Sequence, residues 1–67
     1  MNINVGDKIK WLSKAGELIG EVTKIKLAPN AADKTIPWML VDLGDYRVML
    51  PGTDDYFAMM KLEVVNG

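Results

Sequence analysis

The residues that most often perform enzymatic chemistry are missing from this chain, which contains no histidine and no cysteine. Without imidazole or thiol groups there is no common general base, no usual zinc ligand, no nucleophile–histidine triad and no disulfide. The chain contains 8 Lys and Arg residues and 9 Asp and Glu residues, which gives a formal net charge of -1. We therefore expect a protein that is not an enzyme, with no metal and no cofactor.

Alternating lysines are the first candidate for binding chemistry. Lys8 and Lys10 lie in one expected strand, and Lys24 and Lys26 lie in the next. If the hairpin register places the pairs side by side, four ammonium groups could contact the phosphates of RNA or DNA. The alternative, which we favour, is that alternating lysines keep an outer face soluble and discourage aggregation at the sheet edge. Nearby acidic residues and the net charge of -1 weaken such a patch.

Acidic and aromatic groups give two weaker candidates. Asp54 and Asp55, together with Asp45, could bind a hard cation, but paired acids in a turn are more often solvated or helix caps. Tyr46 and Tyr56, with the two tryptophans, could form an aromatic cage for a methylated side chain. Such a cage requires several rings that converge from neighbouring loops, and we favour neither site.

The element that must position these groups is a hairpin over residues 38–50, whose two apolar strands meet at Gly44-Asp45. Glycine tolerates a positive φ at the first central position of a two-residue turn, which fixes the register. The pairs then expected across the hairpin are Asp42 with Arg47, Val41 with Val48, Leu40 with Met49, and Met39 with Leu50.

The two faces of this hairpin differ in character. The expected core face carries Met39, Val41, Leu43, Tyr46, Val48 and Leu50. The other face is unusually apolar for a solvated one, and aromatic residues and methionine are typical of interfaces. We therefore expect a protein interface made by Trp38, Leu40, Met49, Arg47 and Asp42. Alternatively, a helical turn or the N-terminal arm covers it, and a register slip of one residue would exchange the two faces.

The remaining elements complete a small all-β domain over residues 1–67. Strands are expected at 8–13, 17–27 and 62–65, with a bulge near Thr23-Lys24 that lets Gly20, Val22, Ile25 and Leu27 face one core. Residues 28–35 form the longest loop. Residues 56–60 predict one helical turn, of 3₁₀ type, capped by Asp54 or Asp55.

Four segments resemble small SH3-like barrels of the Tudor and KOW type: Val5-Gly6-Asp7-Lys8-Ile9-Lys10-Trp11, Gly20-Glu21-Val22-Thr23-Lys24-Ile25, Trp38-Met39-Leu40-Val41 and Met60-Lys61-Leu62-Glu63-Val64-Val65. The resemblance implies a five-stranded antiparallel SH3-like barrel with a helical (3₁₀) turn before the last strand. Such barrels bind RNA, peptides or other protein subunits.

One enzyme class is also similar. Plasmid-borne type II dihydrofolate reductases look similar at Gly6-Asp7-Lys8 and from Ala15-Gly16 through Val22, but their active pore is lined by a Val-Gln-Ile-Tyr segment. This chain has Tyr46-Arg47-Val48-Met49 at the corresponding strand, so the reductase activity is not carried over.

We expect a non-enzymatic binding module that acts through a protein interface, most simply as a homodimer. An RNA- or DNA-binding barrel that uses the lysines is the alternative, and a small inhibitor from a phage or mobile element is a third possibility. No apolar run reaches the roughly 18 residues of a membrane span, and no basic segment leads into an apolar one at the N-terminus. The expected location is the cytoplasm.

Overall fold

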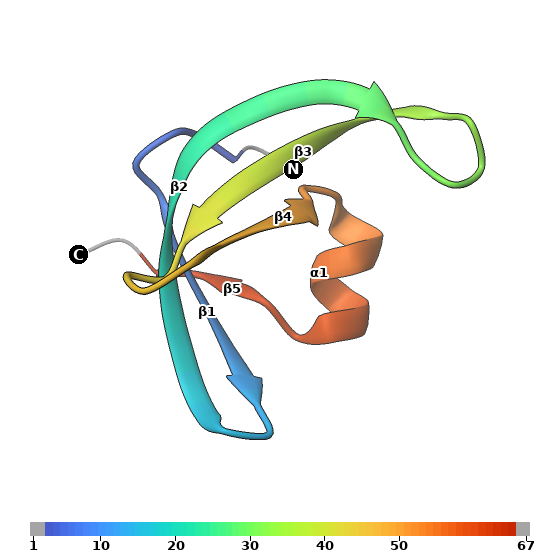
Figure 1. Cartoon of the computed structure of the whole chain (residues 1–67). Coiled ribbons are helices and arrows are strands. Elements are labelled where there is room, and N and C mark those ends of the chain that lie inside the picture. Colours follow the sequence, from blue (N-terminus) through green and yellow to red (C-terminus); the bar gives the residue numbers. More distant parts are fainter. Residues whose placement is uncertain (1–2, 66–67) are drawn as a thin grey trace.

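The computed structural model describes residues 3–65, which form five strands and one helix (Figure 1). In chain order these are β1 (Lys8–Ser13), β2 (Gly16–Pro29), β3 (Thr35–Asp42), β4 (Arg47–Pro51), α1 (Asp54–Met60) and β5 (Glu63–Val64). All strand pairs are antiparallel, and the sheet order is β4-β3-β2-β1-β5. The all-β class is as expected. The expected closure into a barrel is not observed, because the described strands form one open sheet with β4 and β5 at its edges.

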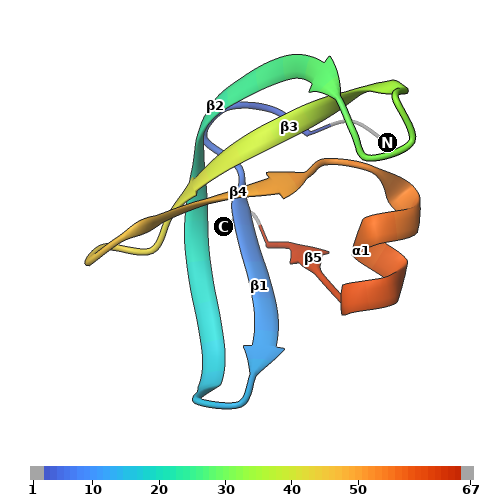
Figure 2. The ribbon, with the colours of Figure 1, turned by 45° about the vertical axis from the view of Figure 1, so that its right-hand side comes forward.

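Strand β2 bends strongly and joins the two halves of the sheet (Figure 2). Its first part pairs with β1, and its second part pairs with β3. The predicted bulge is confirmed, since the pairing register shifts between Val22 and Lys24. The hydroxyl of Thr23 donates a hydrogen bond to the Leu40 carbonyl across this bulge, at 3.3 Å. The prediction that Leu27 faces the core is wrong: its side chain is 69% exposed, in the part of β2 that runs beyond the core.

The β3–β4 hairpin has the predicted turn and register. The N–H of Leu43 donates to the Tyr46 carbonyl at 2.9 Å, and Gly44 has a φ of 98°. Asp45 has no positive φ, so the turn is of the type with glycine at its first central position. All four expected cross-strand pairs are present, from Asp42 with Arg47 to Met39 with Leu50.

The core lies between the concave side of the sheet and α1. It consists of Ile9, Val22, Met39, Val41, Phe57 and Leu62. Phe57 attaches the helix to this core, and Figure 1 shows α1 on the concave side of the sheet. The predicted core face of the hairpin is confirmed except at Tyr46, which is 54% exposed because it lies at the hairpin tip.

The helical segment differs from its prediction. Instead of a 3₁₀ turn over 56–60, α1 is a seven-residue α-helix, and its N-cap is Thr53 instead of Asp54 or Asp55. The hydroxyl oxygen of Thr53 accepts a hydrogen bond from the Tyr56 N–H at 3.3 Å. The two aspartates occupy the first turn, where negative charge favours the helix dipole. Phe57 lies in the middle of the helix, and its side chain is buried in the core.

The predicted loop over residues 28–35 is also shorter in the structure. Strand β2 continues to Pro29 and β3 begins at Thr35, which leaves residues 30–34 as the connection. The side-chain oxygen of Asn30 accepts hydrogen bonds from the N–H groups of Ala32 and Lys34, at 2.9 and 3.0 Å. These bonds give the short connection a defined shape.

Candidate protein interface on the outer face of the sheet

The expected interface residues share one face of the sheet. Because side chains alternate along a strand and Met39 is buried, Trp38, Leu40 and Asp42 point away from the core. Their partners in β4 are Pro51, Met49 and Arg47 respectively. We call this surface of β2, β3 and β4, opposite α1, the outer face. All five residues predicted for the interface lie on it.

Apolar side chains form the centre of the outer face. Leu40 is half-buried, and Met49 opposite it is 49% exposed. Trp38 is also half-buried, and its indole N–H donates to the Ala28 carbonyl of β2 at 3.2 Å. This hydrogen bond satisfies the polar group of the ring and holds it against β2. The face therefore presents an ordered aromatic ring beside an exposed methionine.

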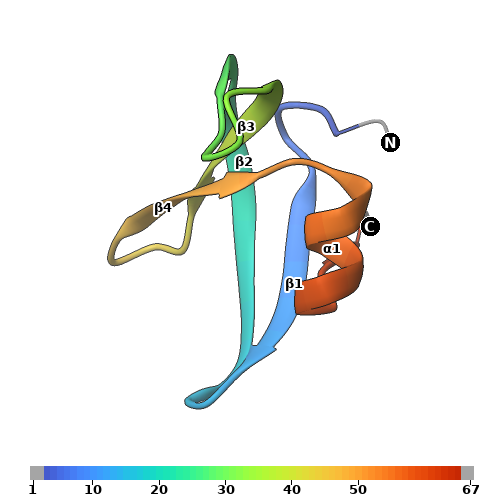
Figure 3. The ribbon, with the colours of Figure 1, turned by 90° about the vertical axis from the view of Figure 1, so that its right-hand side faces the viewer.

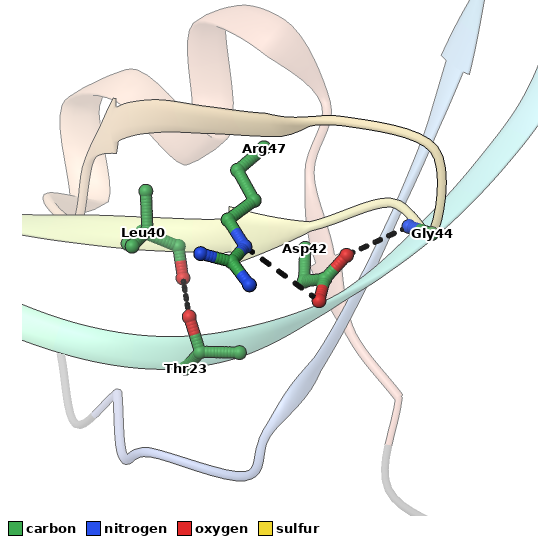
Figure 4. Close-up of polar contacts among 5 residues, drawn as sticks. All are labelled: Thr23, Leu40, Asp42, Gly44 and Arg47. Carbon is green, nitrogen blue, oxygen red and sulfur yellow. Dashed lines mark hydrogen bonds and ion pairs between the residues drawn. The ribbon is translucent and has the colours of Figure 1, made fainter.

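Asp42 and Arg47 form the polar end of the outer face (Figure 4). The Asp42 Oδ2 lies 3.9 Å from the Arg47 Nε, and Oδ1 accepts a hydrogen bond from the Gly44 N–H at 2.8 Å. Because both side chains are partly exposed, the ion pair adds little stability. The hydrogen bond from Gly44 is the more informative contact, because it holds the Asp42 carboxylate against the turn and so fixes the orientation of this side chain.

The four lysines do not form one stripe. Lys8 lies opposite Glu21, and Lys10 lies opposite Ile19, with its ammonium group 3.7 Å from a carboxylate oxygen of Glu63. The two later lysines instead belong to the outer face, where Lys24 pairs with Leu40 and Lys26 pairs with Trp38. The register therefore does not place the two lysine pairs side by side.

Sequence reasoning missed that Lys24 and Lys26 border the apolar centre. The predicted bulge was sufficient to place these two lysines, because a shift of phase after Val22 puts positions 24 and 26 on the face opposite Ile25. Pro51 was missed too, although it follows Met49 at the same-face spacing of two. Both additions extend the candidate interface.

The other candidates are not assembled. Tyr46 lies at the hairpin tip, whereas Tyr56 belongs to α1 beyond the other end of β4, so the two rings do not converge. Tyr56 instead lines an open groove with Ile36, Pro51 and Met59. Among residues 3–65, no three His, Cys, Asp or Glu side chains are grouped so that they could hold a metal ion.

Comparison of the chain with protein-family models, with curated proteins and with solved structures found no match. Within the described part of the chain, no helix has both the length and the apolar character needed to cross a membrane. Any functional assignment therefore depends on the geometry of the chain itself.

Proposed function

We propose that this chain is a non-enzymatic binding module that associates with a second copy of itself through the outer face. The observation that carries this proposal is the pairing of half-buried Leu40 with exposed Met49, beside Trp38, on the side of the sheet opposite α1. Large apolar groups gathered on one exposed surface are typical of protein interfaces, whose centres are enriched in Trp and Met.

The small core favours self-association on energetic grounds. Only six hydrophobic residues of the described chain are buried, and a domain of 67 residues without disulfides has a small margin of stability. Burying Met49 and the exposed side of Trp38 in a dimer removes further apolar area from water. Association would thus stabilise the folded chain in a concentration-dependent manner.

We further propose that the domain is of the SH3-like class. Three features support this assignment: the strand order β4-β3-β2-β1-β5, a bent β2 that pairs with both halves of the sheet, and a short helix just before the last strand. Since domains of this class differ widely in what they bind, this assignment names neither a partner nor a binding surface.

Binding of RNA or DNA is the second candidate function. Its support is local: Lys24 and Lys26 lie beside Trp38, so two cations border an aromatic ring that a base could stack on. Against it, the other two lysines face Glu21 and Glu63. The protein interface is the better-supported proposal.

Light scattering over a dilution series tests the main proposal. We expect the wild type to be a dimer, and the double variant Leu40→Glu with Met49→Lys to be a folded monomer. The matched control is Leu12→Glu with Met59→Lys, because Leu12 and Met59 are 78% and 69% exposed and lie outside the outer face. This control should remain a dimer. A monomeric wild type, or a double variant that dimerises as the wild type does, would overturn the proposal.

A further inference from the structure

Strand β4 has an unused hydrogen-bonding edge. It is the last strand of the sheet and pairs only with β3 among the described strands. In an antiparallel pair, bonded and non-bonded residue pairs alternate. The N–H of Leu43 bonds to the Tyr46 carbonyl and the N–H of Gly52 bonds to the Pro37 carbonyl, which fixes the phase. Tyr46, Val48, Leu50 and Gly52 therefore direct their backbone groups toward β3.

The residues between them direct their backbone groups outward. Arg47 and Met49 each direct one N–H and one carbonyl to the free edge, because β3 is the only described strand that pairs with β4. Pro51 offers only a carbonyl, because proline has no N–H. The usable edge therefore consists of two donors and two acceptors in alternation, followed by a proline that ends it.

We propose that two copies of this chain join through their β4 edges, antiparallel, about a two-fold axis at Val48. Arg47 then lies opposite Met49 of the partner subunit, and each such pair exchanges two N–H···O bonds. The two symmetric pairs use all four donors and all four acceptors. This inference rests on the proposed self-association but assigns the contact to the β4 edge, because pairing about this axis continues the sheet and leaves the two outer faces side by side instead of packed against each other.

The proline selects this register over its neighbour. If the axis passed through Met49, Pro51 would lie opposite Arg47 of the partner subunit. Because proline has no N–H, the Arg47 carbonyl of the partner subunit would then lack a hydrogen-bond donor. With the axis at Val48, Pro51 falls beyond the paired residues. The resulting ladder is short, but it pairs every outward N–H and carbonyl group of Arg47 and Met49.

Side chains at the hairpin tip fit the same arrangement. On the inner face, Tyr46 would lie opposite Leu50 of the partner subunit, which explains why a tyrosine that is 54% exposed stands in a core-facing phase. On the outer face, Met49 would continue the apolar centre toward the partner. Figure 3 shows that the tip of this hairpin projects away from α1.

Amide hydrogen exchange provides the direct test, on the unmodified chain. In a monomer the amides of Arg47 and Met49 face water, whereas those of Val48 and Leu50 are bonded to β3. At protein concentrations that favour the dimer, we expect exchange at Arg47 and Met49 to slow by at least about tenfold and to recover on dilution. If these two amides exchange at the same rate in dimer and monomer, the edge pairing is wrong.

A pair of substitutions at one position gives an independent test. Arg47→Pro removes an outward N–H and leaves the bonds to β3 intact, whereas Arg47→Ala removes the same charge and keeps the N–H. We expect the proline variant to be a folded monomer and the alanine variant a dimer. If Arg47→Pro dimerises while Leu40→Glu with Met49→Lys does not, association uses the outer face alone and the edge inference fails. A monomeric wild type would defeat both proposals.

Discussion

Gly20 of β2 lies directly against the side chain of Val41 in β3. A Cβ atom at position 20 would overlap the Cγ1 of Val41, and it would lie 2.9 Å from the Cδ2 of Leu43. These two side chains require a residue without a Cβ atom at position 20. The contact lies where β2 turns from β1 toward β3, so it limits what can be placed at the bend.

Gly20→Ala should therefore destabilise the fold by about 1 to 3 kcal/mol, because an added methyl group forces the neighbouring side chains to move. In a domain of this size the melting temperature would fall by several degrees. Thermal unfolding followed by circular dichroism measures the change. In a Val41→Ala background the same substitution should cost less, since the overlapping methyl group is gone. Equal costs in the two backgrounds would show that the Gly20–Val41 contact is not responsible.

The turn contact of Asp42 should matter more than its ion pair. Asp42→Asn keeps a side-chain oxygen for the Gly44 N–H and loses the charge, so we expect a loss of at most about 0.5 kcal/mol. Asp42→Ala loses the acceptor as well and should cost about 1 kcal/mol. Urea unfolding of both variants makes the comparison. If the asparagine variant is as unstable as the alanine variant, the ion pair with Arg47 is the dominant contact.

The cap of α1 offers a third prediction. Thr53→Ala leaves the N–H of Tyr56 without its side-chain acceptor and should destabilise the protein by about 1 kcal/mol. Thr53→Ser should restore most of that loss. Thr35→Ala, at an exposed strand end, serves as the control for removal of a threonine. A loss at Thr53→Ala no larger than at Thr35→Ala would argue against a capping role.

Salt distinguishes the two candidate functions. An apolar interface should change its dimer dissociation constant by less than about threefold between low and moderate salt, whereas several phosphate contacts weaken binding by orders of magnitude. We expect no tight binding of a single-stranded RNA oligonucleotide. If binding occurs, Lys24→Glu with Lys26→Glu should reduce it more than Lys8→Glu with Lys10→Glu. The reverse order would contradict the separation of the two lysine pairs in the sheet.

Local patterns were sufficient to predict the hairpin and the bulge. The Gly44-Asp45 turn fixed the register of Leu40 and Met49, and the phase change in β2 required an extra residue near Thr23. These features depend on residues close together in sequence, where turn chemistry and period-two alternation are reliable guides.

Features that depend on distant contacts were predicted less well. The α-helix that replaces the expected 3₁₀ turn buries Phe57 in the cluster that includes Ile9 and Met39, and local propensity does not contain this packing. The exposure of Leu27 follows from where the core ends, and the separation of Lys8 from Lys24 follows from the change of pairing partner along β2. Tertiary packing decides all three.

The bulge at Thr23 also changes which residues of β2 face the core. Before it, even-numbered residues such as Gly20 and Val22 point inward; after it, the odd-numbered Ile25 does. If β2 kept Thr23 but ran without the bulge, uniform alternation would exchange the two sides of its second half and drive Lys24 and Lys26 inward. One residue that contributes no side chain to the core thus determines which side of that half-strand is inside.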